Sequence, residues 1–265
     1  MIKFFRKIRQ KLISMGKTEQ YLKYAIGEII LVVVGILIAL SINNWNEDRK
    51  KQDLINSQLL NLATSLKSDI SMWNNLTNIN EFRCSSFEYL LEKAGQSFRI
   101  LPDLPKADST FLWKGPYPDP DITDINFIKE SFSWFTKGFQ GVTIDRSALN
   151  EINNLGLFSE IKNNQLKTKI RDYYMLIDFH FSFQNNQRRM DISEGFYRYI
   201  RDNYNMAPLD VPDMIDPIEF IKNDKGIIFR LKESRDLANW HGLKALDTKN
   251  LADEIIEMIE HEVVQ

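Results

Sequence analysis

The sequence predicts an all-α fold with an N-terminal basic amphipathic segment, one transmembrane helix, and then an extracytoplasmic bundle with long antiparallel helices. The run at 26–42, IGEIILVVVGILIALSI, is apolar apart from Glu28 and is long enough to cross a bilayer, for which about 17–20 residues suffice. After this run, apolar residues recur at spacings of three and four, as they do on helices. The sequence contains no convincing alternation of the kind that marks strands.

The charges on either side of the apolar run predict its orientation. Basic residues precede it against a single acid, Glu19, whereas acids and bases balance just after it. Because basic residues in short flanks stay in the cytoplasm, we expect a cytoplasmic segment 1–24, a transmembrane helix 25–43 and an extracytoplasmic helical domain 44–265. A cleaved signal peptide is the competing interpretation, but the apolar stretch is longer than a usual signal core.

Residues 2–15 have the pattern of an amphipathic helix on an anionic leaflet, although the same residues could act only as a topology signal. Thr18 is the expected cap of a second helix that runs into the span. Within the span, Glu28, Gly35 and Ala39 fall on one stripe, and small residues four apart let two helices approach closely. A homo-oligomer would use this stripe. Alternatively, Glu28 only reaches the nearby cytoplasmic interface.

Residues 44–96 contain no proline and predict one long amphipathic helix that continues from the span. Asp69 interrupts its apolar seam, which indicates packing against other helices within a domain. Five prolines between 97 and 121 then mark an irregular excursion, and loops of this length are often functional.

Helical patterns return after the excursion and continue to the C-terminus. The expected helices run from Ile125 to about Phe139, from a cap at Asp145 to Gly156, from a cap at Asn163 or Asn164 to about Tyr204, and from Asp216 through Ile221. A last helix follows the turn at 223–226. Its apolar seam comprises Ile228, Leu231, Ala238, Ala245, Ala252, Ile256, Ile259 and Val263.

The composition and the motifs of the sequence give little evidence for a catalytic or ligand-binding site. The net charge of −2 gives no basic field, so we expect no nucleic-acid partner. Cys84 is the only cysteine, which excludes an internal disulfide and favours a buried, inert thiol. Neither a Gly-x-Ser-x-Gly elbow nor a phosphate-binding glycine loop occurs.

Two acidic groups could bind a metal, but each has a simpler explanation. Glu254, Glu257 and His261 share one helix face, which a solvated face explains. The segment from Asp119 to Glu130 resembles the sequence pattern of a calcium-binding loop but has Asp124 where glycine is required. Helix capping explains its acidic residues. We therefore expect no metal and no cofactor.

The residues KYAIGEIILVVVGILIALSINNWNEDRK, at 23–50, resemble a family of uncharacterised single-span membrane proteins of Bacteroidota, classed under a domain of unknown function. The start MIKFFRKIRQKLISMGK also matches this family, and DRSALNEINNLGLFSEIKNNQLKTKIRDYY, at 145–174, is similar to its second recognisable block. The resemblance implies a membrane-anchored, mostly helical protein and no activity. With the charge asymmetry, it leads us to expect a single-pass protein of the bacterial inner membrane with a periplasmic C-terminal domain.

We therefore expect recognition rather than catalysis, in which the extracytoplasmic domain binds or tethers a protein or envelope component beside the lipid bilayer. Trp113 and Tyr117 are the expected partner contacts, because they lie in the proline-rich excursion and not at helical core spacing. One alternative is an envelope enzyme or metal-dependent protein whose site assembles only in three dimensions. Another is a subunit of a multi-protein sensor.

Overall fold

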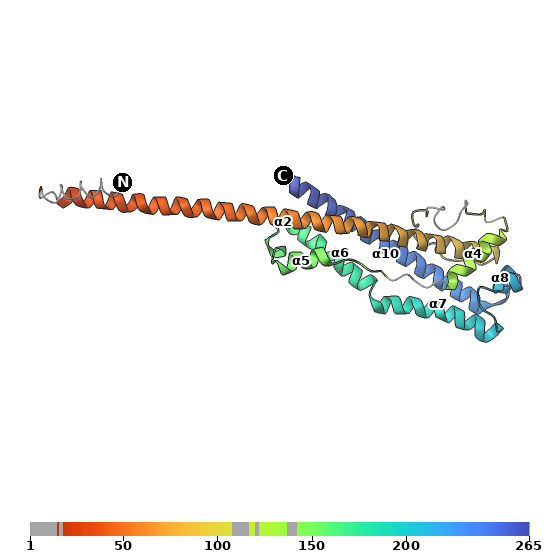
Figure 1. Ribbon diagram of the computed structural model, residues 1–265. Helices are drawn as coiled ribbons and strands as arrows, with labels where there is room; N and C mark the ends of the chain where they lie inside the picture. Colours follow the sequence, from red (N-terminus) through yellow and green to blue (C-terminus); the bar gives the residue numbers. More distant parts are fainter. Residues whose placement is uncertain (1–14, 16–17, 108–116, 120–121, 137–141, 265) are drawn as a thin grey trace. The chain divides into compact units, whose positions relative to one another are not determined.

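The computed structural model describes residues 15, 18–107, 117–119, 122–136 and 142–264, which are drawn in colour in Figure 1. These residues form α-helices and one short 3-10 helix, with no strand among them, so the predicted all-α class is confirmed. The chain divides into two compact units, residues 1–57 and 58–265, and helix α2 (Thr18–Lys93) contributes to both. The predicted amphipathic helix at 2–15 lies outside the described residues except for Met15.

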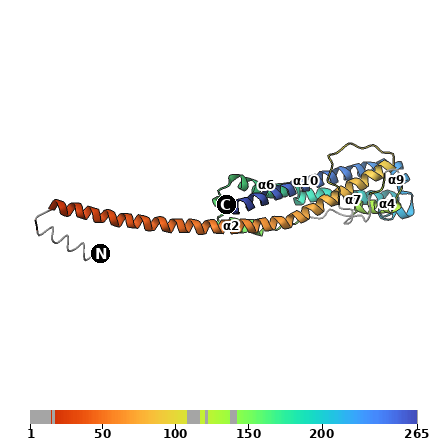
Figure 2. The same cartoon turned by 90° about the horizontal axis from the view of Figure 1, so that it is seen from above.

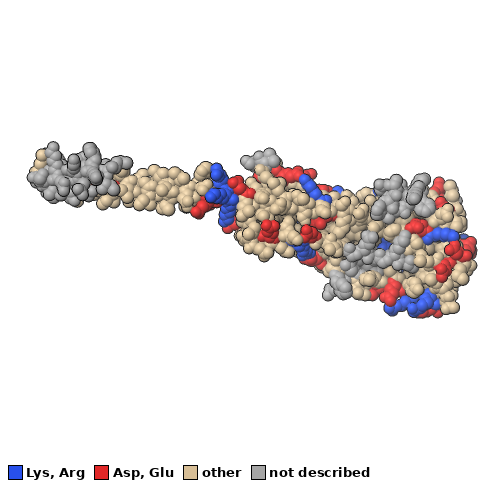
Figure 3. Space-filling model, viewed as in Figure 1, with Lys and Arg blue, Asp and Glu red and all other residues tan. Residues whose placement is uncertain are grey.

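Unit 1 consists, in its described part, of the first half of α2. The helix begins at Thr18, so this residue is its first member rather than the cap we expected. Within α2, an 18-residue window has a mean hydropathy of 2.8, and none of it is buried. Figure 3 shows this stretch as uncharged surface on the face in view. Helix α2 is therefore long and apolar enough here to cross a membrane.

Unit 2 is built on the second half of α2 and the C-terminal helix α10 (Lys225–Val264), which lie side by side in both views (Figures 1 and 2). The two helices run antiparallel, because Lys67 pairs with Glu260 at 2.7 Å whereas Cys84 contacts the carbonyl of Arg235. The remaining helices are α4 (Ile125–Thr136), α5 (Ser147–Asn154), η1 (Phe158–Glu160), α6 (Asn164–His180), α7 (Phe183–Tyr204), α8 (Val211–Met214) and α9 (Pro217–Asn223).

The alanine seam of α10 is buried as the spacing predicted. Ala238, Ala245 and Ala252 are all fully buried, and so is Leu231. Small side chains at these positions let neighbouring helices pack closely against the α10 backbone. The seam therefore explains how one 40-residue helix can run through the core of unit 2.

The predicted long helix from Asn163 to Tyr204 is instead two helices, α6 and α7, which are separated at Phe181 and Ser182. In a straight helix, at 100° per residue, the 19 positions between Ile177 and Phe196 would rotate Phe196 about 100° away from the buried face. Both residues are nevertheless buried. The break realigns the two apolar faces, and the Phe181 ring packs there at 4.9 Å from Trp73.

Local capping signals correctly located several helix ends. The Asn163 side chain accepts a hydrogen bond from the Leu166 backbone at the start of α6, and Asp216 accepts two at the start of α9. Gly156 has a φ of +68° directly after α5, a conformation that favours glycine. The expected turn at 223–226 is shorter than predicted, because Asp224 caps α10 and the helix begins at Lys225.

Replacement by alanine is expected to change the free energy of unfolding in opposite directions at two helical glycines. A Cβ at Gly226 would collide with the Tyr199 ring, whose hydroxyl donates a hydrogen bond to Asp224. Gly195 has no atom near the position of a Cβ. We expect Gly195→Ala to raise the free energy of unfolding by up to about 1 kcal/mol through helix propensity, whereas Gly226→Ala lowers it by about 1–3 kcal/mol through overpacking. Urea unfolding of the two variants measures both effects, and stabilisation by Gly226→Ala would contradict this packing.

Candidate functional site

An irregular segment at 97–107, which we call the strap, returns along α2 after that helix ends. Leu104 packs with Cys84 of α2 and Ala238 of α10, and its methyl groups lie where a side chain at Gly242 would be. The Asn239 side chain donates a hydrogen bond of 2.8 Å to the Pro102 carbonyl. The strap therefore lies on both helices.

The Glu81 carboxylate of α2 fixes the far end of the strap. It accepts hydrogen bonds from four donors, although only 3% of its side chain is exposed. The donors are the Ser85 hydroxyl at 2.8 Å, the Lys106 ammonium at 3.0 Å, the Ala107 backbone N–H at 3.0 Å and the Tyr117 hydroxyl at 2.7 Å. Because Ala107 and Tyr117 bind the same carboxylate, this centre brings together two points of the chain ten residues apart.

Arg235 of α10 fixes the near end of the strap, and only 2% of its side chain is exposed. Its Nε donates to Glu88 of α2 at 2.7 Å and one Nη donates to the Arg99 carbonyl at 2.9 Å. The guanidinium also lies 4.5 Å from the centre of the Phe98 ring. A charge this deeply buried is stable only when it is paired and hydrogen-bonded, as this one is.

Tyr117, one of the two expected partner contacts, is half-buried. Its ring lies 5.7 Å from Phe82 and 5.9 Å from Phe127 of α4, and Phe82 also packs against Trp134 at 5.7 Å. Burial, and then its hydrogen bond to Glu81, raises the pKa of the Tyr117 hydroxyl. The other expected contact, Trp113, lies outside the described residues.

Helix α4 forms one wall of a groove of mixed polarity at one end of unit 2. The groove has a volume of about 430 Å³, and α8 and α9 line its other side. Its apolar lining includes Ile125, Ile128, Pro212, Ile215, Pro217 and Ile218, and its charged lining includes Lys93, Asp216, Glu219 and Lys222. Ile125 is 53% exposed, and α4 and α8 lie together in Figure 1. The volume is within the range of about 300–1,000 Å³ typical of ligand sites.

Three sets of interactions hold α4 in place beside this groove. The Asp124 carboxylate accepts hydrogen bonds from the backbone of Asn126 at 2.9 Å and of Phe127 at 3.0 Å, which is the capping role predicted for it. The Tyr89 hydroxyl of α2 donates to the Ile122 carbonyl at 2.6 Å. On the exposed side, Lys129 of α4 pairs with Asp213 of α8. The wall is therefore preformed.

The residues considered for metal binding have other contacts. Glu254 pairs with Lys169, and Glu257 and His261 line a surface hollow with them. Within the described part of the chain, no three His, Cys, Asp or Glu side chains gather closely enough to hold a metal ion. Asp121 of the calcium-like segment lies outside that part.

Buried titratable groups occur at two places along α2, at Asp69 and at Arg83 and Cys84. Cys84 is buried, as predicted, and burial and then the Glu88 carboxylate raise the pKa of its thiol to about 12. Asp69, in the interrupted seam of α2, accepts a hydrogen bond of 2.8 Å from Tyr173 and has a pKa raised by burial. Burial lowers the pKa of Arg83 to about 10.

The predicted stripe in the span lies on exposed surface. Gly35 and Ala39 are exposed on α2 and Glu28 is partly exposed, and no other atom approaches the position of a Cβ at Gly35. The spacing of seven and four keeps the three residues on one face of this continuous helix. Use of the stripe as a helix interface stays a prediction.

Glu81 and Arg235 were not identified as centres from the sequence. Arg235 lies four residues after Leu231 and three before Ala238, so it occupies a seam position. A charged residue at an apolar seam position was therefore the sequence signal that could have identified Arg235. Its partners Glu88 and Arg99 lie more than 130 positions away, and sequence periodicity does not identify them.

The comparison with known proteins matches a segment that covers most of the apolar stretch of α2 and the α2 residues of the Glu81 centre. Residues 28–99 match a family of unknown function (DUF6090). No curated protein and no solved structure matches the chain. The expected domain of unknown function is therefore confirmed over these residues, whereas the single-span nature and bacterial origin of the resemblance stay predictions.

Glu81→Gln tests whether this carboxylate holds the strap. The amide replaces one acceptor oxygen with an NH₂ group that faces donors, so we expect the free energy of unfolding to fall by about 1–3 kcal/mol. The matched control is Glu92→Gln, which alters an exposed glutamate of the same helix and should stay within about 0.5 kcal/mol of wild type. Chemical denaturation gives both values. Equal stability of the two variants would contradict the anchoring role.

Proposed function

We propose that the chain is a single-pass protein of the bacterial inner membrane, with residues 26–42 across the bilayer and the helical unit 58–265 in the periplasm, where it binds a protein or envelope component. The observation that carries the membrane part is the exposed apolar surface of α2. The large apolar side chains between Ile29 and Ile42 are each 47–64% exposed. At about 1 kcal/mol for each half-exposed side chain, contact with water would cost about 10 kcal/mol, as much as a whole domain gains on folding.

The charges beside the span support this orientation. Basic residues predominate before it, and Lys23 and Glu19 form an exposed pair at 2.6 Å on that side. After the span, the bases Arg49, Lys50 and Lys51 are matched by nearby acids. Only the first flank therefore has the excess of positive charge that stays in the cytoplasm.

The groove of α4, α8 and α9 supports the binding part of the proposal. Its lining combines aliphatic side chains with two lysines and two acids, whose charges balance, which favours a partner segment with both apolar and polar side chains over a highly charged ligand. Such a segment would bury the exposed Ile125 and Ile215 side chains. The proposed mechanism is recognition and tethering.

Photo-crosslinking of the full-length protein in intact cells tests the groove. A photoreactive amino acid at Ile125 or Ile215 should give one shared crosslinked product, whereas the same amino acid at Met190, an exposed apolar residue of α7, should not. Substitution of Ile215 by Asp should abolish the product from position 125 without loss of the folded protein. Positions 113 and 117 test the contacts expected at Trp113 and Tyr117 in the same way.

Three results distinguish the alternatives. Crosslinks that form equally at groove and control positions would contradict a groove site. Crosslinked products only from positions 113 and 117 would show that the partner binds the proline-rich segment 97–121 and not the groove. Products that contain only further copies of this chain would favour self-association, for which Glu28, Gly35 and Ala39 are the candidate interface.

A further inference from the structure

Trp45 and Arg49 form an exposed pair directly after the apolar run. The Trp45 side chain is 64% exposed, and the Arg49 guanidinium carbon lies 5.4 Å from the centre of its ring. A spacing of four places the two residues on one face of α2, and this distance is within the range of a cation–π contact. The pair therefore presents an aromatic surface and a cation together.

The position of the pair along the helix matches a membrane interface. At 1.5 Å per residue, Trp45 lies about 4.5 Å beyond Ile42, the last residue of the apolar run. Tyr24 belongs to the same helix and precedes Trp45 by about 32 Å along the axis, close to the thickness of about 30 Å of a hydrocarbon core. A helix that buries residues 26–42 in lipid therefore brings Trp45 to the level of the headgroups.

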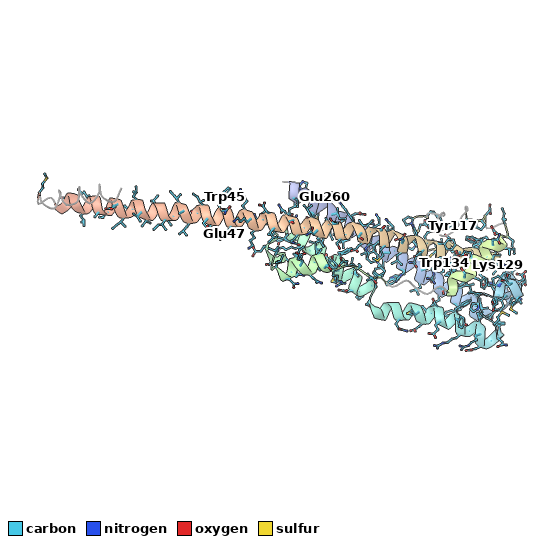
Figure 4. The ribbon with its side chains drawn as sticks, in the orientation of Figure 1. Trp45, Glu47, Tyr117, Lys129, Trp134 and Glu260 are labelled. Atoms are coloured by element: carbon cyan, nitrogen blue, oxygen red, sulfur yellow. The ribbon has the colours of Figure 1, made fainter. Side chains whose placement is uncertain are left out.

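One of the two acids on this turn, Glu47, is directed elsewhere. The Glu47 carboxylate accepts a hydrogen bond of 2.9 Å from the Asn43 side chain. Residue 47 is rotated about 200° from Trp45 around the helix, and Figure 4 shows the two on opposite sides of α2. The face of Trp45 therefore presents the Arg49 guanidinium and the indole N–H donor, with the exposed Asp48 about 60° away around the helix.

We propose that Trp45 and Arg49 bind the phosphate of a phospholipid headgroup on the side of the bilayer that the chain reaches after Ile42. The guanidinium offers paired N–H donors that fit two phosphate oxygens, and the indole packs among the glycerol and upper acyl carbons, with its N–H toward water. The contact fixes the depth and rotation of the span. This inference rests on the proposed function, because it requires an inserted span.

Tryptophan quenching in reconstituted vesicles tests the site. The full-length protein is placed in phosphatidylcholine–phosphatidylglycerol bilayers and in phosphate-free galactolipid bilayers, each with brominated fatty acid tracers. Subtraction of the emission of Trp45→Phe isolates the Trp45 signal. In the phosphate bilayer, bromine near the headgroup should quench Trp45 about twofold more than bromine near the chain ends.

The dependence of Trp45 quenching on lipid phosphate and on Arg49 decides whether the pair binds a phosphate headgroup. For wild type and the control Lys50→Gln, the ratio of shallow to deep quenching should fall when the lipid phosphate is removed. For Arg49→Gln, this ratio should be the same in both bilayers. The headgroup site would be overturned if the quenching ratio of wild type were the same in both bilayers, or if that of Arg49→Gln still fell without lipid phosphate. Either result would leave the span inserted. If neither tracer quenches Trp45, the span is not in the bilayer, and the proposed membrane function fails with it.

Discussion

The apolar surface of α2 between Ile29 and Ile42 is the constraint on which the rest of this account depends. No part of this stretch is buried within the structure, although its side chains are among the most apolar in the chain. A lipid environment satisfies the surface directly, since every backbone group of a helix is already bonded within it. The proposed orientation of the chain and the proposed role of Trp45 both depend on that lipid environment.

Unit 2 combines close helix packing with a few deeply buried charges. The alanines of α10 allow the close packing, whereas Glu81 and Arg235 direct the strap along α2 and α10. Replacement of both partners of a buried ion pair by apolar residues can stabilise a protein, whereas removal of one partner leaves an uncompensated charge. These charges therefore serve to specify the path of an irregular segment, which apolar contacts alone would leave less defined.

The helices could be predicted from the sequence because their signals are local. Asn163 and Asp216 cap the helices they were expected to cap, Gly156 lies where α5 ends, and the spacing of three and four identified Ala238 and Ala245 as core. The break after α6 was not predicted, because neither proline nor glycine marks it. It follows from the rotation of the apolar face between α6 and α7.

The candidate site was much less predictable than the helices. Groove residues such as Ile125 and Ile215 come from segments about 90 residues apart, and each alone has the pattern of an ordinary amphipathic turn. The Glu81 centre depends on donors from the strap and from Tyr117, whose positions follow from tertiary packing. Periodicity describes which face of an element is buried but not which distant residue faces it.

Labelling with a membrane-impermeant maleimide in intact spheroplasts tests the central claim most directly. The native Cys84 gives a low background, because it is buried and has a pKa raised to about 12. The variant Leu155→Cys, at an exposed position of unit 2, should react in intact spheroplasts, whereas Glu19→Cys should react only after the membrane is permeabilised. Reaction of Glu19→Cys in intact spheroplasts, or protection of Leu155→Cys until lysis, would contradict a single span with its N-terminus in the cytoplasm.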